Sequence, residues 1–190
     1  MSKSPTKLER TLGCLVGGAC GDALGAPVEF MSLREIHHQF GPKGIREFSP
    51  VYDRVGVVSD DTQLTLFTAE GLVDALSKSP NASNDEIIAS VHVAYLRWLV
   101  TQGVLTPLTD KVVDPTYGLI AEPEMHYSIN AGFTCLNSLT GATTISEFAT
   151  NDSKGNGAIM RIAPVGLVFS DDPMRAFRLG VDIARLIPNP

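Results

Sequence analysis

Helical periodicity dominates this sequence, and it constrains the fold more than any other feature. Between residues 62 and 78 the clearly polar side chains fall on one narrow stripe, and nearly all other positions are apolar or threonine. Residues 84–102 repeat the pattern, with Trp98 on an apolar face and Arg97 on the opposite, polar face. These patterns predict two helices that bury most of their surface against other helices.

Three further segments have helical spacing: residues 8–24, 127–139 and 157–169, the last interrupted by Pro164. In the first, small residues such as Gly17 are expected to let a neighbouring helix approach closely.

The ends of two helices carry local signals. Asn84 is a plausible N-cap for the helix 84–102, and Gly103 a plausible stop. A final helix is predicted to begin at Pro173, with Asp172 as its cap.

Strand-like alternation is confined to residues 55–59. The predicted fold class is therefore all-α, a compact multi-helix bundle. Residues 26–58 and 103–126 lack strong periodicity and are predicted to be long loops.

Length and charge narrow the possible partners. A chain of 190 residues normally builds one core, so we expect a single domain over residues 1–190. The net charge is −6 and no cluster of lysine and arginine exists, which argues against a nucleic-acid partner. Three cysteines without a C-x-x-C pair favour a reducing, cytoplasmic compartment. The apolar stretch near the N-terminus is short for an export segment, and no later stretch is long enough to span a membrane, so no membrane partner is expected.

The stretch "SDDTQLTLFTAEGL", residues 59–72, begins with two adjacent carboxylates. At a helix entrance, consecutive residues lie only about 100° apart around the axis, so Asp60 and Asp61 can converge with Ser59 on one cation. Mg²⁺ and Mn²⁺ prefer such oxygen ligands. The alternative is that Asp60 caps the helix and Asp61 interacts with the helix dipole.

The stretch "GDALGAPVEF", residues 21–30, holds two more carboxylates. Asp22 lies at the end of an apolar helix, where burial is costly without a partner. Glu29 follows a proline in a loop from which it can reach a site. The alternative is an ordinary helix exit at Gly-Ala-Pro.

The stretch "SKGNGAIMRIAP", residues 153–164, offers a turn whose backbone amides precede a predicted helix. Amides and helix dipole both favour negative charge, so the turn Gly155-Asn156-Gly157 is a candidate phosphate or diphosphate site. Ser153 and Asn156 add side-chain hydrogen bonds. An ordinary Asn-Gly turn is the alternative.

Together and in this order, "GCLVGGACGDALGAPVEF", "SDDTQLTLFTAEGL" and "SKGNGAIMRIAPVGL" resemble the ADP-ribosylglycohydrolase family, which includes the dinitrogenase reductase-activating glycohydrolases. The resemblance implies an all-α fold around a pair of Mg²⁺ or Mn²⁺ ions in a central cleft. It also implies hydrolysis of the glycosidic bond between ADP-ribose and a modified side chain.

The resemblance also implies site residues by position. Ser59, Asp60 and Asp61 match the family's N-terminal metal-binding triplet, usually written with threonine first, and Glu29 matches an acidic residue near the metals. The implied metal ligands are thus Ser59, Asp60, Asp61 and Glu29, and the implied catalytic residues are Glu29, Asp60 and Asp61. The loop that holds the diphosphate and adjoining ribose is matched by Ser153, Gly155, Asn156 and Gly157.

The family's second metal-ligand cluster, Asp-x-Asp-[Asp/Thr/Ser], has no counterpart after residue 162. We therefore expect an incomplete domain that lacks part of the binuclear site and associates with itself through uncovered apolar faces. The expected partner is an ADP-ribosylated protein or a small molecule that contains ADP-ribose. The expected function is metal-dependent removal of ADP-ribose; the alternative is an inactive ADP-ribose-binding or structural remnant of the family.

Overall fold

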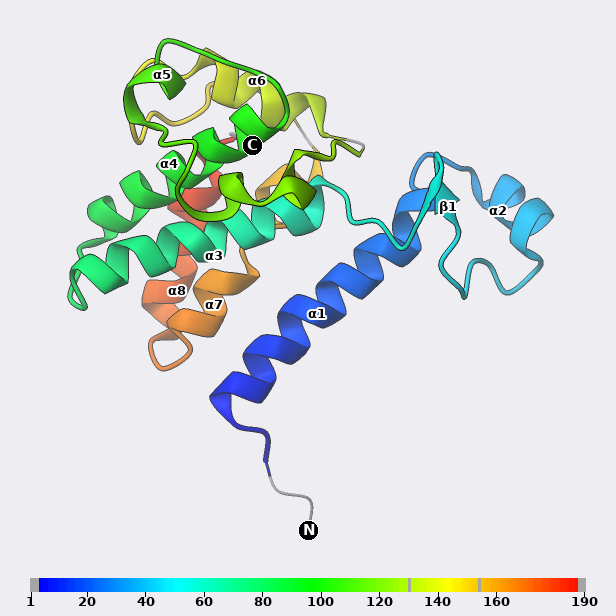
Figure 1. Ribbon diagram of the computed structural model, residues 1–190. Helices are drawn as coiled ribbons and strands as arrows, with labels where there is room; N and C mark the ends of the chain where they lie inside the picture. Colours follow the sequence, from blue (N-terminus) through cyan, green and yellow to red (C-terminus); the bar gives the residue numbers. More distant parts are fainter. Residues whose placement is uncertain (1–3, 130, 154, 188–190) are drawn as a thin grey trace.

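The computed structural model describes residues 4–129, 131–153 and 155–187. Within these ranges the regular structure is almost entirely helical, which confirms the predicted class (Figure 1). The α-helices are α1 (Lys7–Gly25), α2 (Leu33–Phe40), α3 (Asp60–Lys78), α4 (Asn84–Thr101), α5 (Thr109–Val112), α6 (Phe133–Gly141), α7 (Ala163–Val168) and α8 (Pro173–Ala184). The 3₁₀ segments are η1 (Ala26–Val28), η2 (Gly118–Ala121), η3 (Pro123–His126) and η4 (Asn156–Ala158). Strands β1 (Pro50–Val51) and β2 (Arg54–Val55) form an antiparallel pair.

Helices α3 and α4 form the centre of the fold, and α7 and α8 pack beside them (Figure 1). The two central helices come very close at Gly71, where a Cβ atom would lie only 2.5 Å from the Cα of Val91. Trp98 of α4 is fully buried, and its indole N–H donates to Oε1 of Gln63 at 2.9 Å. Gln63, a member of the polar stripe of α3, therefore forms a hydrogen bond inside the core.

The predicted polar face of α4 is wrong at Arg97, which is buried. Its Nη1 donates to Glu70 and Asp74 of α3, at 2.8 Å in each case. Glu70 also accepts the N–H of Leu119 at 2.6 Å, and Asp74 accepts the hydroxyl of Tyr117 at 2.7 Å. These contacts hold η2 against the two central helices. Segment η2 lies within residues 103–126, which were predicted to be a loop.

The structure corrects several predicted boundaries. The predicted helix 127–139 begins only at Phe133, in α6. The predicted helix 157–169 is divided into η4 and α7, because Pro164 occupies the first turn of a new helix. Within 55–59 only Val55 belongs to a strand.

Two helix starts also differ from the prediction. The N-cap of α4 is Ser83 rather than Asn84, because the Ser83 hydroxyl accepts the N–H of Glu86. Helix α2 was predicted as loop, although a Ser32–Glu35 capping box begins it. The start of α8 is as predicted, with Asp172 as its cap.

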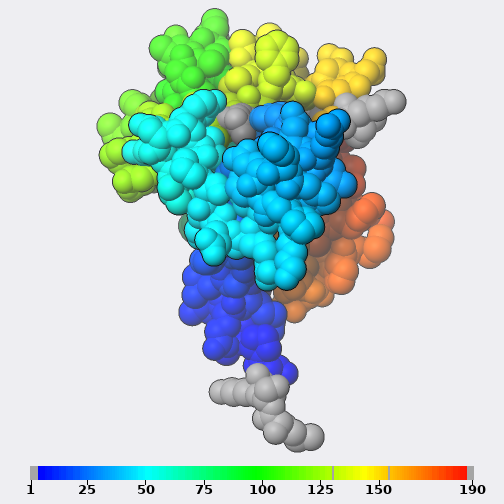
Figure 2. All heavy atoms as spheres, turned by 90° about the vertical axis from the view of Figure 1, so that its right-hand side faces the viewer, coloured from blue at the N-terminus to red at the C-terminus, as the bar shows by residue number. Residues whose placement is uncertain are grey.

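Helix α1 extends away from the helical body (Figures 1 and 2). Its only buried residue is Ala23, and the space around Gly17 is open, so the expected close neighbour is not found. Among the described residues, Lys7–Val28 is the helical stretch long and apolar enough to cross a membrane. Core helices of soluble proteins and signal sequences meet the same criterion of length and composition.

Candidate functional site

The C-terminal end of α1 is joined to the beginning of α3 by Asp22. Its carboxylate accepts the backbone N–H and the hydroxyl of Ser59, at 2.9 and 2.7 Å. It also accepts the N–H and hydroxyl of Thr62, at 3.2 and 2.6 Å. These four hydrogen bonds compensate for the cost of removing the Asp22 charge from water, and they set the position of the Ser-Asp-Asp sequence.

The N-cap of α3 is Ser59, whose hydroxyl accepts the N–H of Asp61 at 3.2 Å. The alternative role of Asp60 as the cap is therefore wrong, because Asp60 is already the first residue of the helix. Capping is done by the serine and by Asp22. Both aspartates lie in the first turn of α3, which is compatible with the predicted alternative that Asp61 interacts with the helix dipole.

The two aspartates lie in an environment that disfavours their charge. Burial is the main cause that raises the pKa of Asp60 to about 6, and it raises the pKa of Asp61 to about 6 as well. The neighbouring carboxylates of Glu29 and Asp22 raise both values further. Asp60 accepts the N–H of Gly132 at 2.9 Å, which partly offsets the shift.

A cavity of about 560 Å³ lies at this point, lined by parts of α1, α3 and the segment after Ser153. Its lining includes Glu29, Ser59, Asp61 and Asn156. The structure thus brings together residues from all three sequence stretches that were singled out. Asp60 is next to this group, with its Oδ2 directed to the backbone of Gly132.

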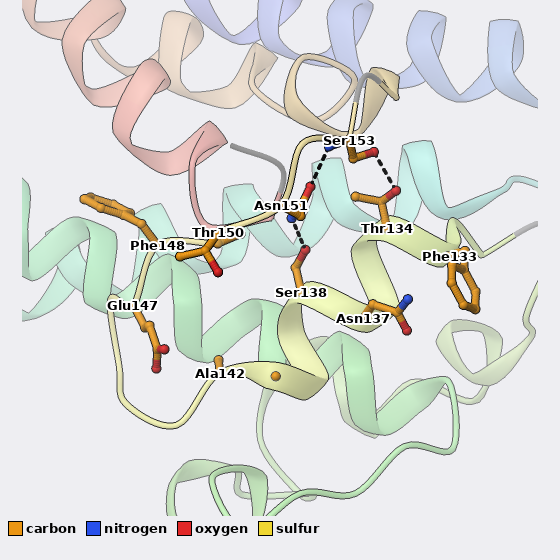
Figure 3. Close-up of a pocket in the computed structure, with 12 residues that line it drawn as sticks. Phe133, Thr134, Asn137, Ser138, Ala142, Glu147, Phe148, Thr150, Asn151 and Ser153 are labelled. Carbon is orange, nitrogen blue, oxygen red and sulfur yellow. Dashed lines mark hydrogen bonds between the residues drawn. The ribbon is translucent and has the colours of Figure 1, made fainter. Parts of the chain in front are cut away.

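The predicted diphosphate loop also contains Ser153, Gly155 and Gly157, and these three residues do not line the cavity of the aspartates. Ser153 lines a second cavity, of about 280 Å³, where its hydroxyl lies 2.8 Å from that of Thr134 (Figure 3). The N–H of Gly155 donates to Ser153 Oγ at 3.4 Å. Gly157 is buried, and a Cβ atom there would lie 3.2 Å from Sγ of Cys135. Asn156 is therefore the member of this set that lines the cavity of the aspartates.

The predicted helix dipole behind this turn is not found. Segment η4 contains only three residues, and α7 begins several positions later, at Ala163. Any stabilisation of an anion on the turn must come from its amides or from other charges.

Sequence reasoning missed two residues next to the site. Gly132 donates to Asp60, and a Cβ at this position would lie 3.1 Å from Asp60 Oδ2, so a larger residue would displace the carboxylate slightly. Arg161 is fully buried, and a charged residue inside the apolar run "AIMRIAP" is a signal that could have identified it. The thiol of Cys135 lies near both, and burial, followed by the charge of Asp60, raises its pKa to about 11.

The candidate ligands at this site are oxygen atoms, the type that a hard cation prefers. Burial is the first cause that raises the pKa values of Asp60 and Asp61, and the neighbouring carboxylates add to it, so a bound cation would lower both values. Over the described ranges, no three His, Cys, Asp or Glu side chains converge as a ready-made metal site.

Fold and site together define an all-α protein with an acidic cavity beside an Asn-Gly turn. A family model described as ADP-ribosylglycohydrolase matches residues 3–187, so the chain belongs to the ADP-ribosylglycohydrolase family.

The name of one curated relative agrees with this assignment. The ADP-ribosyl-[dinitrogen reductase] glycohydrolase of Rhodospirillum rubrum is 28% identical over 174 residues, which cover 89% of this chain and 48% of that protein. Uncharacterized proteins of Archaeoglobus fulgidus and Escherichia coli are 26% and 25% identical, over 85% and 97% of this chain. The chain spans about half the length of these curated relatives.

Proposed function

We propose that this chain serves the metal-dependent hydrolysis of the glycosidic bond between ADP-ribose and a protein side chain. The observation that carries the proposal is the meeting of Glu29, Asp61 and Asn156 around one cavity, with Asp60 next to them. Family membership supports the type of substrate, and the name of the Rhodospirillum rubrum relative describes a protein that acts on an ADP-ribosylated target.

Ser59, Asp60, Asp61 and Glu29 are the side chains that would hold Mg²⁺ or Mn²⁺. When bound, such a cation would neutralise the clustered carboxylates and orient ribose hydroxyls and a water molecule. The two hydrogen bonds that Ser59 donates to the Asp22 carboxylate hold it in position for this role.

The other steps use groups of the chain itself. Glu29 lines the cavity and can accept a proton from the attacking water, the role of the general base in inverting glycosidases. Asn156 can donate its side-chain amide to the ribose or diphosphate. Water attack at the anomeric carbon forms the new C–O bond and breaks the bond to the acceptor atom of the protein. The proton that Glu29 takes from the water is passed on to that acceptor atom, which restores the carboxylate.

The test is release of ADP-ribose from arginine-modified protein by the chain, with and without Mg²⁺. We expect release that requires Mg²⁺, and about a hundredfold or greater loss of rate in Asp60→Asn and Asp61→Asn. Asp171→Asn is the matched control, because Asp171 is exposed and far along the chain from this sequence motif. Serine-linked substrate, assayed in parallel, determines whether arginine is the correct acceptor.

The same assay separates hydrolysis from the alternative of ADP-ribose binding without turnover. Calorimetric binding of ADP-ribose by a folded chain that releases nothing from either substrate would support the alternative and contradict the hydrolase proposal.

A further inference from the structure

Arg161 is a fully buried cation next to the Asn-Gly turn, and the activity proposed above gives it no role. Its Nε donates to the hydroxyl of Tyr95 at 2.9 Å, and its Nη2 donates to the carbonyl of Ala184 at 3.1 Å. Ala184 is the last residue of α8, and the carbonyl end of a helix carries partial negative charge that favours a cation.

These contacts leave the guanidinium only partly compensated. In the part of the chain that the structure describes, Arg161 forms no ion pair with a carboxylate, and its Nη1 has no hydrogen-bond partner. Nη1 lies 3.9 Å from the place that a Cβ atom would take at Gly157. The guanidinium also lies 5.0 Å from the centre of the Tyr95 ring, but no carboxylate pairs with it among the described residues. Because burial of a charge without an opposite charge is costly, a negative charge bound near Nη1 would be favourable.

The described lining of the cavity beside Asn156 lacks positive charge. None of its lining residues within the described ranges is lysine or arginine, and the whole chain carries a net charge of −6. The short η4 segment does not provide the helix dipole that the sequence predicted at this turn. Among the described residues, Arg161 is a cation that lies beside this turn, with Nη1 close to Gly157, and its charge would stabilise an anion there.

We propose that Arg161 is a positioning residue that supports the turn at Gly157 and provides the positive charge for an anionic, diphosphate-class part of the ligand. This inference rests on the proposed function and extends it. Because its side chain is fully buried, Arg161 acts across the turn and does not touch the ligand.

The test is calorimetric titration of ADP-ribose into the wild-type chain and two variants. Arg161→Met removes the charge at similar length, and we expect its affinity to fall about tenfold or more. Arg161→Lys keeps the charge but loses the planar fork, so we expect an affinity within about threefold of wild type together with lower resistance to urea. A purely structural role predicts instead that both variants lose affinity as they lose stability.

Arg178→Met is the matched control, since it removes the same charge from an exposed position of α8 and should bind ADP-ribose as wild type does. Wild-type affinity in Arg161→Met, or equal losses in both Arg161 variants, would overturn the inference. If Arg161→Met does not fold, the folded lysine variant decides: retained affinity supports the charge role, and lost affinity overturns it. Failure of the wild-type chain to bind ADP-ribose would overturn the proposed function, and this inference with it.

Discussion

Residues with shifted pKa values make the free energy of unfolding depend on pH. Outside the site, His92 is the clearest case. Its ring is fully buried, Nδ1 accepts the N–H of Ser146 at 2.8 Å, and Nε2 has no partner among the described residues. Burial lowers the pKa of His92 from 6.5 to about 4. The unfolded chain therefore takes up a proton at a pH where the folded chain does not.

We expect the free energy of unfolding to decrease through His92 as the pH falls from about 6.5 to about 4, by at most about 3 kcal/mol. Asp60 and Asp61 act in the opposite direction, because their raised pKa values favour proton uptake by the folded chain and so stabilise it as the pH falls through about 6. The histidine contribution must therefore be isolated by a variant.

His92→Asn keeps an acceptor for Ser146 but has no titrating group in this pH range. The measurement is urea unfolding at pH 7 and pH 5 for wild type and His92→Asn. Stability that falls between the two pH values by the same amount in both proteins would contradict a role of His92.

At the scale of elements, the close contact between α3 and α4 at Gly71 is a feature that the sequence did not predict. A Cβ at Gly71 would lie 2.5 Å from the Cα of Val91, and backbone cannot move aside as a flexible side chain can. We expect Gly71→Ala to lower the free energy of unfolding by about 1–3 kcal/mol, because the two helices must separate. Chemical denaturation measures the change.

Gly17→Ala on α1 is the matched control, because it also lies inside a 19-residue helix but has open space around it. There the higher helix propensity of alanine should leave stability unchanged or raise it, by about 1 kcal/mol at most. Equal losses in the two variants would show that the close contact at Gly71 is not the cause.

The ion-pair cluster of Arg97, Glu70 and Asp74 joins three elements, α3, α4 and η2. We expect Arg97→Met to cost about 3–5 kcal/mol, because the largely buried carboxylates of Glu70 and Asp74 lose their positively charged partner. Arg185→Met removes the partly exposed pair with Asp182, and this should cost less than about 1 kcal/mol. Urea unfolding of both variants compares them, and a small loss in Arg97→Met would show that water compensates the carboxylates.

The helices that could be predicted are those in which the repeat of apolar residues along the sequence matches the face that is buried. Helices α3 and α4 were predictable because most apolar side chains repeat at helical spacing, whereas Arg97 was misplaced because its burial depends on carboxylates of another helix. The split between η4 and α7 depends on Pro164 and on contacts of Met160 and Arg161 that no local pattern contains.

For the molecule as a whole, motif order gave more information about the site than any single residue did. Residues Glu29, Ser59, Asp61 and Asn156, far apart in sequence, were predicted to act together, and the structure places them around one cavity. The partner of Asp60, Gly132, was not predictable, since its role depends on a backbone N–H brought there by the chain between η3 and α6.

At the scale of the molecule, α1 carries exposed apolar side chains along one side. Leu8, Leu12 and Val16 lie at intervals of four residues, and they are 67%, 53% and 59% exposed. Residues at this spacing share one helix face, so together they form a continuous apolar stripe. Such stripes favour association because contact removes apolar surface from water.

We therefore expect the chain to self-associate increasingly with concentration, and the substitutions Leu12→Glu and Val16→Glu to shift it toward the monomer in analytical ultracentrifugation. Stability should change little, since neither side chain contributes to the core. Val73→Glu is the control, because Val73 is equally exposed, at 61%, but lies on α3. If all three variants change the association equally, the effect comes from added negative charge; if none does, the stripe on α1 is not an interface between copies of this chain.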